Sequence, residues 1–213
     1  MSTAGQAYLV RPDAGTGPGV LLLHSWWGLN RATKDVADDL ADAGFVVVAP
    51  DLFEGVLPGD VDEAISVLGA ADPDAMAALV VSSAVALRSQ TDDPDGPIAA
   101  VGYSMGGSWA LWLATRQPDT VRAVVTYYGT QRIDFDDLRA PVLGHFASDD
   151  DLVSDDELIE MHAHLLLSDK SVLIHRYEGT GHGFAEPAWG SAHRPAAAAE
   201  AWARTLEFLR GTS

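Results

Sequence analysis

The sequence predicts an α/β fold in which a mostly parallel central sheet is covered by helices on both faces. Short apolar segments of strand length recur along the 213 residues, and segments with helical periodicity separate them. Continuous apolar strands are typical of parallel sheets because both of their faces are buried. No repeat, linker or low-complexity segment interrupts this alternation, so we expect one domain over residues 1–213.

The first fifty residues are expected to form three strands and one helix. A short strand over Ala7–Val10 is followed by a loop rich in Gly and Pro, and Val20–His24 is then a continuous apolar run. Thr33–Ala43 has apolar residues at helical spacing, and Gly44 is a natural stop. Phe45–Ala49 completes this part as a second buried strand.

The middle of the chain is expected to hold three helices around one strand. Val61–Ser89 is alanine-rich with a helical period, and Pro73 is expected to begin the second of its two helices. The next apolar run starts at Ile98 and ends in Gly-Tyr-Ser-Met-Gly, residues Gly102–Gly106. A segment of helical character, Ser108–Arg116, follows at once.

The last part of the chain continues the same alternation. Its expected strands are Val121–Tyr128, Pro141–Phe146 and Ser171–Tyr177. Its expected helices are Asp155–Leu167 and Pro195–Leu209, with a loop over Gly179–Pro187.

The Gly-x-Ser-x-Gly motif carries the strongest chemical signal. A strand, a sharp turn and a helix form the context of a nucleophile elbow, in which a strained turn exposes the hydroxyl of Ser104. Gly102 and Gly106 leave room because they have no Cβ. Met105 is expected to offer its backbone N–H to an oxyanion, because helix N-termini carry unpaired donors. The alternative is an ordinary Gly/Ser turn between a strand and a helix.

A histidine and an acidic cluster follow at later strand ends, where active groups gather in such sheets. His182 follows the last strand and lies between two glycines, and Asp149, Asp150 and Asp151 follow the strand before it. A serine hydroxyl needs a neutral imidazole to remove its proton, and that imidazole needs a carboxylate to fix its tautomer. Spacing alone leaves the three acids open, and a turn-capping role is the alternative for His182.

Composition excludes several other classes. A formal net charge of −18 disfavours binding to nucleic acid or anionic membranes. The absence of cysteine excludes thiolate catalysis and Cys-ligated metals. His162 and His164 would point to different faces of their helix, so they do not form a metal pair. The predicted chemistry implies no metal and no organic cofactor. No apolar stretch approaches the roughly 20 residues of a membrane span. The N-terminus has no signal-peptide pattern, so a cytoplasmic location is expected. The expected state is a monomer or a homodimer.

Several motifs together resemble the dienelactone hydrolase family of α/β-hydrolases. They occur in family order over most of the chain: Val20–Asn30, Ala49–Phe53, Gly102–Gly107, His145–Asp150 and Gly181–Phe184. The resemblance implies the α/β-hydrolase fold, here with little room for a lid. It also implies that Asp150 is the acid of the triad and that the backbone N–H of Trp26 joins that of Met105 in the oxyanion hole.

The chain departs from this family at three positions. The family's best-studied members use a cysteine where this chain has Ser104, and a regulatory glutamate where it has Ser25. They hold the substrate carboxylate with an arginine where Glu186 stands, so an anionic substrate would be repelled. The resemblance therefore favours a neutral ester or lactone. Tentative substrate contacts are Ser25, Trp27, Tyr103 and Phe184, although core packing is the alternative for the aromatic residues.

The sequence thus predicts a serine-dependent hydrolase of small carboxylic esters or lactones, with Ser104, His182 and Asp150 as its triad. Two alternatives remain open. Acyl transfer or amide cleavage would use the same triad, and a non-catalytic binding protein would keep only the fold.

Overall fold

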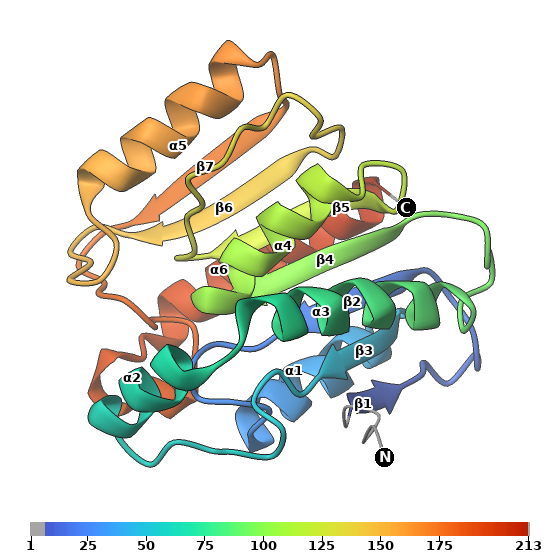
Figure 1. The fold of residues 1–213 in the computed structure, drawn as a ribbon, viewed down its shortest axis with the longest axis horizontal. Helices are drawn as coiled ribbons and strands as arrows, with labels where there is room; N and C mark the ends of the chain where they lie inside the picture. Colours follow the sequence, from blue (N-terminus) through green and yellow to red (C-terminus); the bar gives the residue numbers. More distant parts are fainter. Residues whose placement is uncertain (1–6, 213) are drawn as a thin grey trace.

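The computed structural model describes residues 7–212, within which seven strands form one sheet (Figure 1). The strands lie in the order β1-β3-β2-β4-β5-β6-β7. β1 pairs antiparallel with β3, and the other pairs are parallel, which confirms the predicted sheet. The strand bounds are Ala7–Val10 (β1), Gly19–Leu23 (β2), Val46–Pro50 (β3), Ile98–Tyr103 (β4), Val121–Tyr127 (β5), Val142–Ala147 (β6) and Val172–Tyr177 (β7).

Helices connect the strands close to the expected positions. Their bounds are Arg31–Asp42 (α1), Val61–Ala70 (α2), Pro73–Arg88 (α3), Met105–Arg116 (α4), Asp155–Leu167 (α5) and Pro195–Gly211 (α6). Pro73 begins α3 as predicted. α4 begins at Met105, so the glycines after Ser104 already belong to the helix. A short 3₁₀ helix, η1 (Pro187–Ala192), was not predicted, because its sequence has no helical period.

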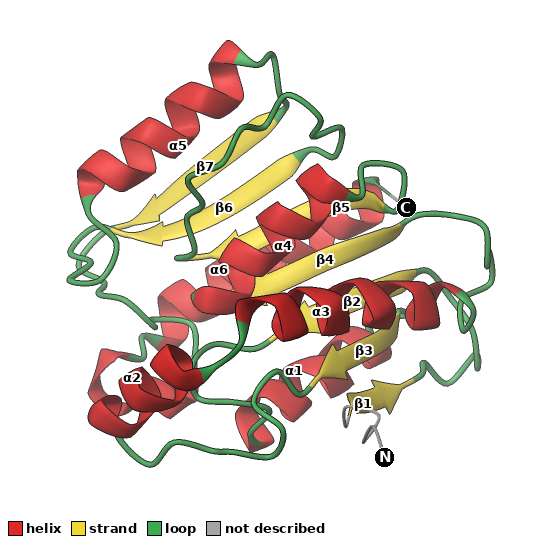
Figure 2. Ribbon diagram, in the orientation of Figure 1, coloured by secondary structure: helices red, strands yellow, loops and turns green. Residues whose placement is uncertain are grey.

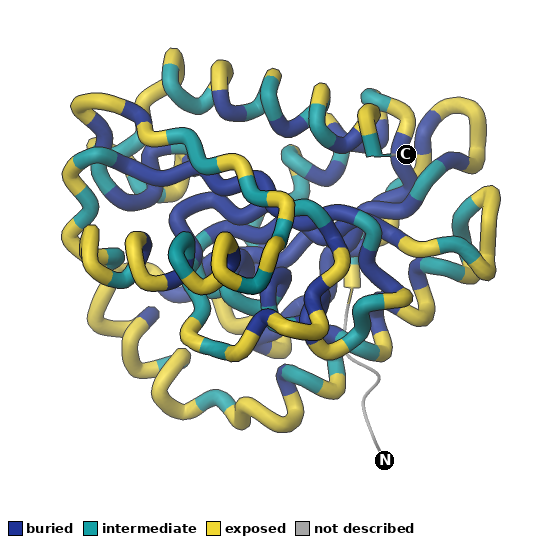
Figure 3. Tube along the Cα trace, turned by 90° about the horizontal axis from the view of Figure 1, so that it is seen from above, coloured by how far each residue is buried: buried dark blue, intermediate teal, exposed yellow. Residues whose placement is uncertain are grey.

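The sheet separates two hydrophobic cores. Side chains alternate along each strand, so in β2 Leu21 and Leu23 face one core while Val20 and Leu22 face the other. The first core is closed by α3, α4 and α5, and the second by α1 and α6. Figure 2 shows these helices on opposite sides of the sheet. In Figure 3 the buried segments run through the middle, and the exposed positions lie on the outer helices and loops. The carboxyl ends of the parallel strands meet at one edge.

α2 and α3 differ in how firmly they attach to the sheet. α3 buries five residues along its length, whereas α2 buries only Ala64 and exposes Val61, Ile65 and Leu68. α3 is therefore the helix that anchors this pair to the sheet.

In residues 7–212 no single helix is long and apolar enough to cross a membrane. Only α2 and α3 taken together, as a pair bent by 88°, pass that test of length and composition.

Direct backbone contacts fix the start of α4. A Cβ on Gly102 would collide with the carbonyl oxygen of Gly106, and a Cβ on Gly106 would collide with the carbonyl oxygen of Leu23. Both positions therefore need glycine because of close approach. The first turn of α4 consequently rests against the ends of β4 and β2, which places residue 104 at the carboxyl edge of the sheet.

Candidate active site

Ser104 lies at a sharp turn between β4 and α4. Its backbone angles are φ 51° and ψ −118°, in the left-handed half of the map that a serine rarely occupies. Its N–H donates to the carbonyl oxygen of Tyr127 at the end of β5, at 2.8 Å, and its carbonyl accepts from the N–H of Gly107 in α4. These bonds hold the strained residue from both sides. Its side chain makes no capping hydrogen bond to α4, so the hydroxyl is free to point elsewhere.

Three side chains from different strand ends form a hydrogen-bonded relay. The Oγ atom of Ser104 is 2.8 Å from Nε2 of His182, and Nδ1 of His182 is 2.9 Å from both carboxylate oxygens of Asp150. The side chains of His182 and Asp150 are only 5% and 6% exposed. An ionised carboxylate can only accept, so Nδ1–H donates to Asp150 and leaves the lone pair of Nε2 for the serine hydroxyl.

The turn between β6 and α5 selects one acid of the three. Asp150 Oδ1 also accepts the backbone N–H groups of Leu152 and Val153, each at 2.9 Å, so the turn itself orients the carboxylate. Asp149 is exposed and accepts from the hydroxyl of Ser148 instead. The structure therefore brings Asp150, and not Asp149, to His182.

The two backbone N–H groups expected to donate to an oxyanion, those of Trp26 and Met105, belong to segments that contact one another. Met105 is the first residue of α4, and Trp26 follows β2 by three residues. Because α4 touches the end of β2 at Leu23 and His24, these two segments lie side by side. His24 is fully buried, and it fixes the segment by contacting the carbonyl of Ser25 at 2.6 Å and accepting the N–H of Leu52. Burial lowers the pKa of His24, so it acts here as a neutral ring.

Aromatic rings surround the relay. The ring of His182 lies between Tyr128, at 4.7 Å between centroids, and Trp189, at 5.1 Å. Trp189 also stacks on Trp26 at 5.2 Å and meets Trp27 edge-on at 5.5 Å. Trp27 and Trp189 are half-buried, so they form the partly exposed aromatic wall of the site.

Glu186 lies inside the site rather than at its mouth. It is buried, and its carboxylate accepts from the hydroxyl of Ser25 at 2.6 Å, from the hydroxyl of Tyr128 at 2.8 Å and from the indole of Trp189 at 3.2 Å. Burial raises its pKa, while these donors and the positive form of His182 act in the opposite direction. Ser25 is therefore a buried partner of Glu186 and is not exposed to a substrate.

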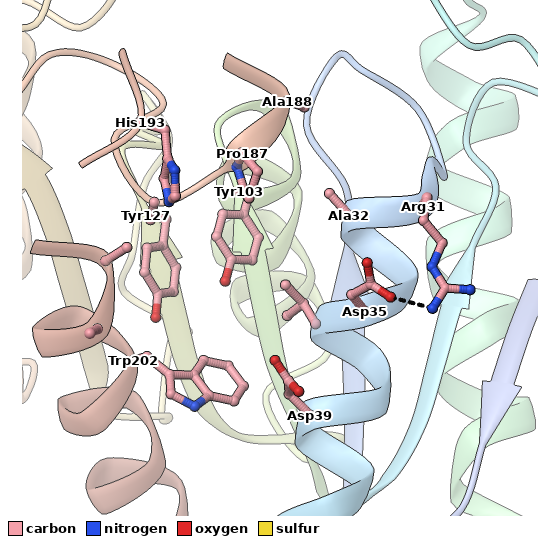
Figure 4. Close-up of a pocket in the computed structure, with 14 residues that line it drawn as sticks. Arg31, Ala32, Asp35, Asp39, Tyr103, Tyr127, Pro187, Ala188, His193 and Trp202 are labelled. Atoms are coloured by element: carbon pink, nitrogen blue, oxygen red, sulfur yellow. Dashed lines mark ion pairs between the residues drawn. The ribbon is translucent and has the colours of Figure 1, made fainter. Parts of the chain in front are cut away.

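Two aromatic residues expected to line the substrate pocket lie elsewhere. Phe184 is fully buried and packs on Tyr128 and Tyr177 within the second core, so the core-packing alternative describes it. Tyr103 stacks on Tyr127 and faces a groove of about 580 Å³ between α1 and α6. Figure 4 shows Tyr103 in that groove, with Asp39 and Trp202 nearby. Tyr103 points there because alternate side chains of β4 face opposite cores.

Two aromatic neighbours of His182, Tyr128 and Trp189, were not predicted from the sequence. Tyr128 follows β5 at the carboxyl edge, and its φ of 42° is unusual for a bulky residue, but no motif marks it. Trp189 lies in η1, which has no sequence signature. The position of Tyr128 directly after a buried strand was the one available signal. Among residues 7–212, no three His, Asp or Glu side chains gather where they would hold a metal ion.

A serine at a strand-to-helix elbow, in a mostly parallel sheet covered on both faces, defines an α/β-hydrolase. A sequence model of the dienelactone hydrolase family matches residues 6–213. The chain belongs to the dienelactone hydrolase family. It is therefore an enzyme, of the carboxylic ester hydrolase class.

Individual proteins are similar to this chain over most of its length. A protein from Bradyrhizobium named as a probable 2-oxo-3-(5-oxofuran-2-ylidene)propanoate lactonase is 32% identical, and the match covers 96% of this chain and 88% of that protein. Protein usf of Aquifex pyrophilus is 28% identical, with 96% and 92% covered. A crystal structure described as a dienelactone hydrolase-like promiscuous phosphotriesterase from metagenomic libraries has a TM-score of 0.82 at 23% identity and covers 99% of both chains. That likeness shows the fold.

Proposed function

We propose that this enzyme hydrolyses small carboxylic esters or lactones through a covalent acyl-enzyme on Ser104. The observation that carries the proposal is the unbroken relay from the Ser104 hydroxyl through His182 to Asp150, with contacts of 2.8 and 2.9 Å. Such a relay, held on a strained elbow, is the arrangement that converts a weak hydroxyl nucleophile into an effective one.

In the first half of the reaction, Oγ of Ser104 attacks the carbonyl carbon of the substrate as Nε2 of His182 takes the hydroxyl proton. The carbonyl electron pair moves onto oxygen, and the N–H groups of Trp26 and Met105 stabilise this oxyanion. Asp150 stabilises the imidazolium through Nδ1. When the oxyanion collapses, the bond to the leaving oxygen breaks, and that oxygen takes the proton from His182.

In the second half, a water molecule replaces the serine as the nucleophile. His182 removes a proton from the water as its oxygen attacks the acyl carbon, and the same two N–H groups stabilise the second oxyanion. Collapse breaks the bond to Oγ, and His182 returns the proton to Ser104. The products are a carboxylic acid and an alcohol, which remain joined in one molecule when the substrate is a lactone.

The substrate class rests on the family and on the walls of the site. One relative carries the name of a lactonase, which supports a lactone among the substrates. Trp27 and Trp189 offer an apolar, partly exposed surface for a small acyl or alcohol group. Glu186, a buried carboxylate close to His182, opposes a second negative charge at this position. These features favour a neutral ester or lactone over an anionic one.

The direct test is hydrolysis of p-nitrophenyl acetate and butyrate by the wild type, Ser104→Ala and Ser108→Ala. Ser108 lies one turn further along α4 and bonds the carbonyl of Thr130, so its variant is a matched control for the loss of a hydroxyl. We expect Ser104→Ala to lose turnover by several orders of magnitude. Ser108→Ala should keep it.

Labelling with a fluorophosphonate separates the proposal from its alternatives. A catalytic Ser104 should be labelled in the wild type and not in Ser104→Ala, whereas a non-catalytic binding protein would not be labelled at all. Matched ester and amide substrates then distinguish ester hydrolysis from amide cleavage. Equal activity of the wild type and Ser104→Ala on the esters would refute the proposal.

A further inference from the structure

Glu186 connects three segments that meet around His182. Ser25 comes from the loop after β2, Tyr128 from the end of β5, and Trp189 from η1. Each partner also touches the catalytic relay or its surroundings. Ser25 precedes Trp26, whose N–H is proposed for the oxyanion hole, and the rings of Tyr128 and Trp189 enclose His182. One buried carboxylate therefore links the loop that carries Ser25 and Trp26, called the oxyanion loop below, to the rings of Tyr128 and Trp189 that contact His182.

A carboxylate, whose two oxygens accept, satisfies the hydrogen-bond pattern around Glu186. The indole N–H of Trp189 can only donate, so Oε2 must accept, and Oε1 lies 2.6 Å from the hydroxyl of Ser25. Glutamine can satisfy the same pattern, with its carbonyl at the Oε2 position and its amide donating to Ser25 Oγ. Glu186→Gln therefore removes the charge and keeps the contacts.

The electrostatic setting makes this charge important for His182. Three other titratable groups act on His182 or Glu186: Asp150 in the β6–α5 turn, Tyr128 after β5 and Tyr103 in β4. His182 and Glu186 also act on one another. In its positive form, His182 favours the ionised form of Glu186. The influence is mutual, so an ionised Glu186 favours the imidazolium that forms when His182 accepts the serine proton.

We infer that Glu186 is a charged positioning residue of the active site, which holds Ser25, Tyr128 and Trp189 around His182 and stabilises its imidazolium. This inference rests on the proposed function in that the imidazolium is an intermediate of that reaction. Glu186 forms no bond with the substrate. Its effect reaches the reaction through the oxyanion loop and through the charge of His182.

Three variants test the two parts of this role. Glu186→Gln removes the charge, Ser25→Ala cuts the tether to the oxyanion loop but leaves the charge, and Glu178→Gln removes one exposed carboxylate after β7 as the matched control. For each we would measure kcat and KM across pH, and the thermal midpoint. We would also follow the NMR signals of the His182 ring against pH in a Ser104→Ala background.

Glu186→Gln is expected to lower kcat about tenfold or more with KM nearly unchanged, and to move the His182 titration and the acid limb of kcat to lower pH. Ser25→Ala should lower kcat by a smaller factor and move the titration less than Glu186→Gln does. Glu178→Gln should change none of these. An unmoved His182 titration in Glu186→Gln, or an equal shift in Glu178→Gln, would overturn the inference.

The NMR titration needs no substrate, which separates this inference from the proposed function. If the wild type hydrolyses no ester while Glu186→Gln still shifts His182, the coupling of the two residues stands and the proposed reaction fails. If esters are hydrolysed and the titration does not move, the reaction stands and the role of Glu186 fails.

Discussion

Two carboxylates act on His182, and the chain holds them in different ways. Asp150 meets Nδ1 at 2.9 Å and is oriented by two backbone N–H groups of its own turn, between β6 and α5. The carboxylate of Glu186, in the loop after β7, accepts hydrogen bonds only from side chains, and these come from residues 25, 128 and 189. The first acid is a product of local turn geometry. The second depends on tertiary packing, so changes at distant positions can disturb it.

The largest effect that would sharpen this comparison is expected from Asp150→Asn. The amide cannot serve as the charged acceptor of Nδ1–H, so His182 loses both its fixed tautomer and the stabilisation of its imidazolium. We expect kcat to fall by about 10⁴-fold with the fold intact. Steady-state kinetics and circular dichroism measure the two quantities. A loss smaller than that of Glu186→Gln would reverse the ranking of the two acids.

An intermediate effect is expected from Tyr128→Phe. The variant keeps the ring against His182 but removes one donor to Glu186, which leaves part of a buried carboxylate unpaired. We expect a loss of about 1–3 kcal/mol in the free energy of unfolding and a decrease in kcat of a few fold. Chemical denaturation and ester kinetics check both. If stability and kcat are unchanged, then Tyr128 contributes through the packing of its ring and not through its hydrogen bond to Glu186.

The pH dependence of stability offers a smaller and more specific test. Burial raises the pKa of folded Glu186 above its ordinary value of 4.5, so the folded protein binds this proton more tightly than the unfolded chain does. The free energy of unfolding should therefore fall as pH rises from about 4.5 through the folded pKa, because Glu186 ionises in the folded state at a cost. Glu186→Gln should lack this component. Urea unfolding between pH 4.5 and 7.5 measures the difference between the free energies of unfolding of the two proteins. A difference that does not change with pH would contradict the prediction.

The smallest effect is expected from Asp149→Asn. This side chain is exposed and accepts only from Ser148, so we expect kcat to stay within about twofold of the wild type, as for most surface substitutions. The same kinetic assay as for Asp150→Asn makes the two neighbours directly comparable. A large loss at position 149 would mean that the turn, and not the carboxylate of Asp150, governs His182.

The same contrast explains what the sequence could and could not predict. Three features depend on local pattern and chain order, and they could be predicted from the sequence. These are the alternation of strands and helices, the elbow at Ser104, and the order of serine, acid and histidine. The side of the sheet to which Tyr103 points and the full burial of Phe184 depend on packing between distant elements. The partners of Glu186 belong to this second kind. Its position was visible in the sequence, but residues 25, 128 and 189 meet only in the folded chain.

The glycine contacts around Ser104 also bear on how such a site can change in evolution. Gly102 and Gly106 are required because their backbones press on one another and on Leu23, whatever atom the residue at position 104 carries. Replacement of the nucleophilic oxygen by sulfur therefore leaves these backbone contacts unchanged. A methyl group on Gly102 or Gly106 would disrupt them. In a library of random variants, positions 102 and 106 should tolerate few substitutions. Position 104 should admit cysteine in a folded protein, so a lineage can change its nucleophile in one step.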